Sequence, residues 1–156
     1  MAMSYEKLRV YQFSLQFLSF AGGIIERLPR GNGPIADQFR RAAASVCLNT
    51  AEACGRIRDA DRKRHFAIAR GSAMECGAVL DVLNELKIID PILYRNQKQR
   101  LTVIVAMLSK LARTSQFEQE QEQEQEQESV DDRGDVQVKD EGKGQGIAAA
   151  IIPLGR

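Results

Sequence analysis

The chain has 156 residues, of which 44% are hydrophobic and 28% charged, enough for one domain with a buried core. Its net charge of +1 hides two opposed parts, because residues 1–114 hold 18 Lys and Arg against 10 Asp and Glu, whereas residues 115–156 hold 4 against 11. No apolar run approaches the ~20 residues of a membrane-spanning helix, and residues 1–11 lack the apolar core of a secretion signal. We therefore expect a cytoplasmic protein with no membrane partner.

The first predicted helix spans residues 4–28, with Ser4 as its N-cap. Apolar residues at alternating steps of three and four predict a coiled-coil-like buried seam for this helix. That seam comprises Leu8, Tyr11, Leu15, Leu18, Gly22 and Ile25. A second buried face is indicated by further apolar residues outside the seam, namely Val10, Phe13, Phe17 and Phe20.

Three more helices follow. The second is predicted from Pro34 to residue 53 or 54, with Gly55 ending it in the left-handed conformation. The third begins with Asp59 or Asp61 as its cap and continues to about residue 89, and its buried seam is Phe66, Ala69, Ala73, Cys76, Leu80 and Leu83. The fourth is capped by Asp90 and ends near residue 113. Short loops and the lack of a strand pattern predict an all-α, antiparallel up-down-up-down four-helix bundle over residues 1–114.

Residues 115–156 are predicted to form a disordered, low-complexity acidic tail. Glu and Gln alternate from Glu118 to Glu128 without a hydrophobic face. Such a segment buries too little apolar surface to offset an ordering cost of ~1–2 kcal/mol per residue. Near the end of the chain, Ile147 to Leu154 form an apolar patch that could dock on the bundle or on a partner.

The sequence shows no assembled catalytic chemistry, and we predict a protein that is not an enzyme and holds no metal or cofactor. A di-metal site in a helical bundle needs two Glu-x-x-His pairs, but the only histidine, His65, has no Glu three residues before it. A surface or partly packed role is the favoured interpretation of His65, and a catalytic base is the alternative. We interpret the three cysteines, Cys47, Cys54 and Cys76, as small buried residues of a reduced protein rather than as disulfide or metal ligands.

Basic residues gather at two places that are candidates for contact with nucleic acid. Five positive charges lie within nine residues around the turn between the second and third helices, and a pair lies inside the second helix. Such charge binds backbone phosphates of RNA or DNA through counterion release. The candidate contacts are Arg40, Arg41, Arg56, Arg58, Arg62, Lys63 and Arg64. A basic run can also be a solvated or ion-pairing face, so charge alone leaves both interpretations open.

A polar stripe runs along the second helix, because residues 45, 49, 52 and 56 are spaced four, three and four apart. Two glutamates, one in this stripe and one in the third helix, lie among small apolar residues and would be costly to bury without partners. Their expected partners are Arg41, Asn49, Arg56 or Ser72, within or between subunits, and a catalytic acid pair is the alternative. The predicted structural polar network comprises Ser45, Asn49, Glu52, Ser72 and Glu75.

The segment from Gln38 to Ser45, followed by Asn49, Ala51-Glu52 and Gly55-Arg56, resembles the four-helix-bundle proteins of the S23 or 23S rRNA intervening-sequence family. The segments 5–11 and 68–75 are similar to that family as well, and the resemblance covers about residues 4–113. It implies a small bacterial protein. The related accessory variability determinants of diversity-generating retroelements form pentamers that bind nucleic acid and a reverse transcriptase. Cys47 stands where the family usually has proline, so we expect a straighter second helix.

The resemblance thus implies a homo-oligomer, a pentamer by analogy, with RNA or DNA and a reverse transcriptase as candidate partners. Together with the charge pattern, it leads us to expect a non-enzymatic accessory or 23S rRNA intervening-sequence-associated protein that binds nucleic-acid backbone. The alternative is a protein–protein interaction scaffold without nucleic-acid binding, which would use the extra apolar faces of the first and fourth helices.

Overall fold

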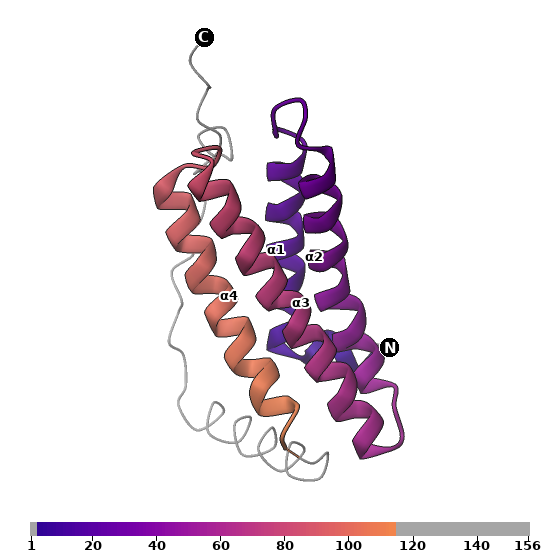
Figure 1. Cartoon of the computed structure of the whole chain (residues 1–156). Helices are drawn as coiled ribbons and strands as arrows, with labels where there is room; N and C mark the ends of the chain where they lie inside the picture. The colour runs from indigo at the N-terminus through magenta and orange to yellow at the C-terminus, as the bar shows by residue number, and fades with distance from the viewer. Residues whose placement is uncertain (1–2, 115–156) are drawn as a thin grey trace.

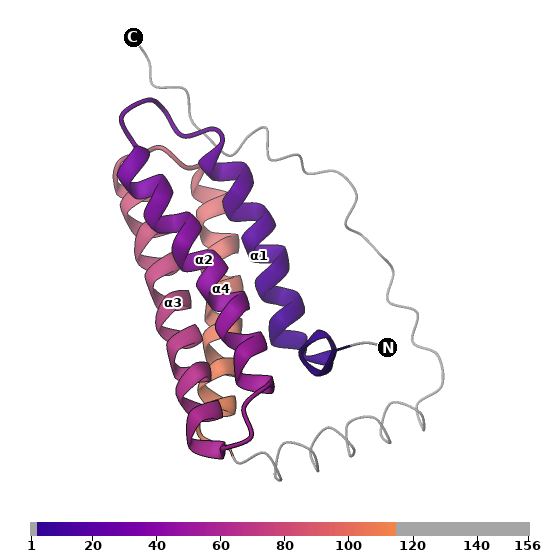
Figure 2. The same ribbon diagram turned by 90° about the vertical axis from the view of Figure 1, so that its right-hand side faces the viewer.

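The computed structural model of the chain describes residues 3–114, which form four long helices preceded by one short 3-10 helix. These elements are η1 (Ser4–Lys7), α1 (Arg9–Ile25), α2 (Gly33–Cys54), α3 (Asp59–Glu85) and α4 (Pro91–Leu111). The four helices run up and down along one common axis (Figures 1 and 2). The prediction of an all-α, antiparallel four-helix bundle is confirmed. The predicted disordered tail, residues 115–156, lies outside the described residues.

The two ends of the bundle carry different connections. The α1–α2 loop and the α3–α4 turn lie at one end, and η1, the α2–α3 turn and the last residue of α4 lie at the other (Figure 1). Short connections of this kind force each helix to pack against its neighbour in the sequence. Both ends of the described chain therefore lie at the same end of the bundle as the α2–α3 turn.

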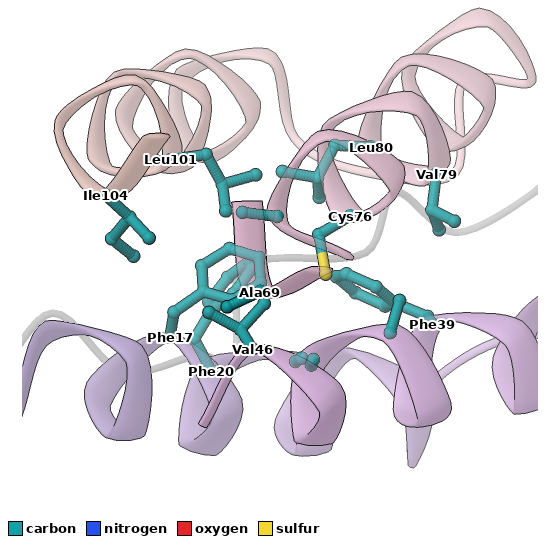
Figure 3. Close-up of a cluster of buried hydrophobic side chains, with 14 of the residues drawn as sticks. Phe17, Phe20, Phe39, Val46, Ala69, Cys76, Val79, Leu80, Leu101 and Ile104 are labelled. Atoms are coloured by element: carbon teal, nitrogen blue, oxygen red, sulfur yellow. The ribbon is translucent and has the colours of Figure 1, made fainter. Parts of the chain in front are cut away.

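The core lies between the helices and receives large side chains from all four (Figure 3). Phe17 of α1 and Phe39 of α2 pack edge to face, with ring centroids 6.0 Å apart and an interplanar angle of 73°. Burying one such side chain contributes ~1.5–3 kcal/mol. In α3 the six residues of the predicted seam are all buried, from Phe66 to Leu83. The helix α2 is continuous over Gly33–Cys54, and Cys47 lies in it as a buried residue.

The buried seam of α1 differs from the predicted one. The residues that face the core are Val10, Ser14, Phe17, Phe20, Ala21 and Ile24, whereas Leu15 of the predicted seam is 42% exposed. Burying an aromatic side chain removes more apolar area from water than burying a leucine does. The face of α1 that carries the phenylalanines is therefore the one that packs in the core. Ser14 can share that face because its hydroxyl donates to the Val10 carbonyl at 2.7 Å and needs no water.

The start of the first helix was also predicted wrongly. Ser4 does not cap a long helix, because Ser4–Lys7 form the separate 3-10 helix η1. Leu8 follows with extended dihedral angles, φ −73° and ψ 122°, and α1 begins only after it. The Glu6 carboxylate accepts a hydrogen bond from the backbone N–H of Met3 at 3.1 Å. This bond satisfies a free N–H group at the start of η1 and stabilises this short helix.

Two helix ends differ from the prediction, and one helix start confirms it. Gly55 ends α2 with φ −86°, so the left-handed conformation expected there is not used. That conformation occurs instead at Lys87, with φ 56°, and it ends α3 at residue 85 rather than 89. Asp90 caps α4 as predicted, since its Oδ1 accepts from the backbone N–H groups of Ile92 and Leu93, both at 2.9 Å.

Candidate nucleic-acid interface

The predicted polar stripe lies along the seam between α2 and α3. Ser45 of α2 and Ser72 of α3 face each other, with their hydroxyl oxygens 2.8 Å apart. The Asn49 amide donates to the Ser45 hydroxyl at 3.0 Å, and its Oδ1 lies 3.2 Å from Nδ1 of His65. The structure thus brings three of the predicted network residues together and joins them to His65. The sequence signal for His65 was its position seven residues before Ser72, which places both on one face of α3.

The two glutamates lie at opposite ends of this stripe. Glu52 forms an ion pair with Arg56, one turn further along α2, and its Oε1 lies 3.6 Å from Nε2 of His65. Glu75 accepts a hydrogen bond from the Gln38 side chain, which in turn accepts one from Arg41 at 2.6 Å. Each carboxylate therefore has a partner of its own, and the pair does not meet as two catalytic acids would.

These polar groups form hydrogen bonds within α2 and between α2 and α3. The Ser45 hydroxyl bonds to Ser72 and Asn49, while His65 lies against Asn49 and Glu52 instead. Burial raises the pKa of the Cys47 thiol to about 11. Burial, with a smaller contribution from the charge of Glu75, raises the pKa of Cys76 to about 12. Both thiols are protonated at neutral pH and are poor nucleophiles. Within residues 3–114 no group of three or more His, Cys, Asp or Glu side chains could hold a metal ion.

The α2–α3 turn presents two unpartnered guanidinium groups. The side chains of Arg58 and Arg64 are both exposed, and neither guanidinium group makes a hydrogen bond or ion pair with another described residue. Arg56 and Lys63 are also accessible but each is shared with an acid: Arg56 pairs with Glu52 on α2, and Lys63 Nζ lies 2.9 Å from an Asp59 carboxylate oxygen. Arg58 and Arg64 are therefore the residues of this turn that an incoming phosphate meets without first displacing a carboxylate.

Arg62 must be removed from the predicted contacts. It is only 5% exposed, and its guanidinium lies 5.5 Å from the centroid of the Phe66 ring. It donates to the Asp59 carboxylate at 3.3 Å and to the backbone carbonyl of Thr114 at 3.2 Å. These contacts tie the start of α3 to the segment that follows α4. Arg62 is a structural residue, and it lies inside because its helical position faces the core side of α3.

The second predicted basic pair lies apart from the turn. Arg40 and Arg41 are exposed on α2, and Arg41 Nε lies 3.2 Å from an Asp37 carboxylate oxygen. At 1.5 Å per residue, the helix rise between Arg40 and Arg56 is ~24 Å. The structure therefore divides the predicted contacts into two patches on one molecule rather than joining them into one surface.

Charge is distributed unequally between the two ends of the bundle. We define the basic end as residues 3–9, 52–65 and 110–114, which contain 9 Lys and Arg against 4 Asp and Glu. The opposite end, residues 26–37 and 85–95, contains 4 of each and is neutral. The basic end thus carries +5 of the +8 of residues 1–114. The excess positive charge of residues 3–114 is thus concentrated at the end that holds the α2–α3 turn.

The fold and this site define a small helical-bundle protein with a polar seam and one cationic end. No helix among residues 3–114 is long and apolar enough to cross a membrane. Residues 6–110 match the family model of the 23S rRNA-intervening sequence proteins, and the chain belongs to this family.

Comparison with solved structures supports the same fold. The chain is similar to a crystal structure from Bacteroides thetaiotaomicron VPI-5482, described as a protein with unknown function from the S23 ribosomal protein family. The two share 22% sequence identity with a TM-score of 0.61, over 67% of this chain and 99% of that chain. A search among curated proteins finds no match.

Proposed function

We propose that this protein is a non-enzymatic, homo-oligomeric accessory protein that binds the phosphate backbone of RNA or DNA through its basic end. The observation that carries the proposal is the pair of exposed, unpartnered guanidinium groups, Arg58 and Arg64, on an end with a net charge of +5. The name of the family, 23S rRNA-intervening sequence protein, favours RNA as the first nucleic acid to test.

The geometry favours contact with phosphates rather than with bases. Arg58 immediately precedes α3 and Arg64 lies six residues further along, a helix rise of ~9 Å, and both are exposed close to the α2–α3 turn. Guanidinium groups in such positions meet backbone oxygens, which carry no sequence information. Arg56 and Lys63 contribute to binding only where a phosphate competes with their carboxylate partners, Glu52 and Asp59. We therefore expect binding that depends strongly on salt and little on sequence.

The test is fluorescence anisotropy of the full chain with a labelled RNA hairpin and a labelled DNA hairpin of the same sequence. We expect binding at ~50 mM salt that weakens steeply towards ~200 mM, since each neutralised phosphate adds ~0.7–0.9 to the slope of log K against log salt. The double variant Arg58→Gln and Arg64→Gln should lower that slope by ~1.4–1.8.

A matched control variant removes the same charge from the neutral end. Arg27 and Arg30 are exposed there, and Arg27→Gln with Arg30→Gln should leave most of the slope in place. Equal losses for the two double variants would show that only net charge matters and would refute a localised interface. The absence of binding to either hairpin at ~50 mM salt would refute the proposal as a whole.

Self-association is supported by a separate observation on the outer face of α2 and α3. Leu48 on α2 is 68% exposed and Ile68 on α3 is 41% exposed, and along each helix they fall between the residues of the Ser45–Ser72 and Asn49–His65 pairs. Exposed apolar side chains grouped on one face are typical of a protein interface. We propose that this face, rather than the faces of α1 and α4, joins the subunits.

The same face supports the alternative function, a protein-interaction scaffold without nucleic-acid binding. Light scattering distinguishes the cases: an oligomer that becomes monomeric in Leu48→Gln supports self-association through α2 and α3. A wild-type chain that is monomeric at micromolar concentration contradicts it. An oligomer that binds neither hairpin favours the scaffold.

A further inference from the structure

The acidic tail begins at the basic end of the bundle. Thr114 is the last described residue, and its backbone carbonyl accepts a hydrogen bond from the buried Arg62 of α3 at 3.2 Å. This bond holds the exit of the chain beside the α2–α3 turn rather than at the opposite end (Figure 1). The position where the tail starts is therefore fixed by the fold.

The sequence that follows is the most acidic part of the chain. Residues 118–128 contain six Glu and no Lys or Arg. Glu118 comes four residues after Thr114, so even a fully extended chain keeps it within ~14 Å of the exit. The neutral end of the bundle is ~30 Å away, the length of α4, and a charge at that distance is screened in physiological salt, where the Debye length is ~8 Å.

We propose that residues 118–128 lie against the basic end of the same molecule and compete with the nucleic-acid backbone for Arg58 and Arg64. This inference rests on the proposed function for its second half only, because the contact itself needs no nucleic acid. A row of carboxylates presents the same chemistry as a row of phosphates, namely regularly spaced anionic oxygens that accept from guanidinium groups. The tail acts as a tethered anionic competitor.

Tethering makes this weak contact effective. An exposed carboxylate–guanidinium pair is individually weak and screened by salt. A tether of a few residues nevertheless gives a local concentration on the order of millimolar, and six carboxylates can each accept from the two unpartnered guanidinium groups. Free nucleic acid at micromolar concentration must displace this competitor. The tail of the same molecule is favoured over the tail of a second copy, because only three residues separate Glu118 from Thr114, which is bonded to Arg62 of α3.

The contact is tested first without nucleic acid. We would compare the backbone-amide NMR spectra of the full chain and of a six-glutamine variant, in which all six glutamates of residues 118–128 are changed to Gln. This variant keeps the length of the chain and removes six negative charges. At ~50 mM salt the variant should shift the amides of residues 56–64 and leave those of residues 26–37 unchanged, and the difference should vanish at ~500 mM salt. Identical spectra of residues 56–64 at low salt would overturn the proposal.

Two controls locate the contact. A matched variant neutralises five acids further along the tail, which are Asp131, Asp132, Asp135, Asp140 and Glu141. It should shift residues 56–64 less than the six-glutamine variant does, and an equal or larger shift would overturn the assignment to residues 118–128. The shifts should also be independent of protein concentration, whereas shifts that fade on dilution would show that a second copy supplies the tail.

Competition is then measured with the labelled RNA hairpin. The six-glutamine variant should bind about tenfold more tightly than wild type at ~50 mM salt, and combining it with Arg58→Gln and Arg64→Gln should remove that gain. Amide shifts without any gain in affinity would overturn the competition. If the shifts occur but neither protein binds the hairpin, the tail contact stands and the proposed function fails.

Discussion

Replacing Arg62 by alanine should lower the free energy of unfolding by about 3 kcal/mol, although Arg62 belongs to the same basic run as exposed Arg58. Two hydrogen bonds from its guanidinium are lost, to Asp59 and to the Thr114 carbonyl, each contributing about 1 kcal/mol net. The contact with the Phe66 ring contributes a further ~0.5–1 kcal/mol. The remainder comes from the buried aliphatic stem of the side chain.

The assay is urea unfolding followed by circular dichroism. With ~1–3 kcal/mol per molar urea for a domain of this size, the midpoint should fall by ~1–3 M in Arg62→Ala. The matched variant Arg58→Ala removes an exposed guanidinium four residues away and should change stability by less than ~0.5 kcal/mol. A loss below ~1 kcal/mol for Arg62→Ala, or equal effects of the two variants, would refute the structural role assigned to Arg62.

Three further outcomes are expected from urea unfolding. Asp90→Ala should lower the free energy of unfolding by ~1 kcal/mol, and Asp90→Ser should lower it much less, because serine also caps helices. Equal losses in the two variants would contradict the role of Asp90 as a cap. Single Ser45→Ala and Ser72→Ala variants should each lower the free energy of unfolding by ~1 kcal/mol, because the Ser45–Ser72 hydrogen bond is lost while the remaining hydroxyl keeps its bond to Asn49 or to the Ile68 carbonyl. The double variant should cost less than the sum of the two, and strict additivity would count against the bond. The pKa of Cys76 is raised to about 12, so above pH ~8.5 only the unfolded state releases that proton. Stability should then fall as pH rises, by at most ~1.4 kcal/mol per unit, and Cys76→Ala should reduce the fall; an unchanged slope would contradict this.

The success of prediction differed between helices for a physical reason. In α3 the seam from Phe66 to Leu83 is an unbroken apolar stripe and is buried, whereas the large apolar residues outside it, such as Ile68 and Met74, are isolated among polar or small residues and are exposed. In α1 apolar residues occur on nearly every face, so two seams with the same spacing compete. Periodicity does not choose between Leu15 and Phe17, whereas packing against Phe39 of α2 does.

The candidate site was predicted in part. Spacing along one helix was enough to align Ser45 with Asn49, but the partners Ser72 and His65 depend on how α3 is positioned against α2. The burial of Arg62 was beyond sequence reasoning for a similar reason. In a run of basic residues, only the rotation of α3 decides which guanidinium turns inward, and that rotation is set by the core residues further along the helix.

The order of packing in the bundle has a consequence for how the chain folds. Every helix lies beside its sequence neighbour, and the connections between them are short. Such a fold has low contact order, and domains of this class fold in microseconds to milliseconds. The α2–α3 hairpin joins two long helices through the Ser45–Ser72 and Asn49–His65 pairs, so we expect it to form the nucleus. We expect contact between α1 and α4, the two helices farthest apart in the sequence, to complete the bundle last.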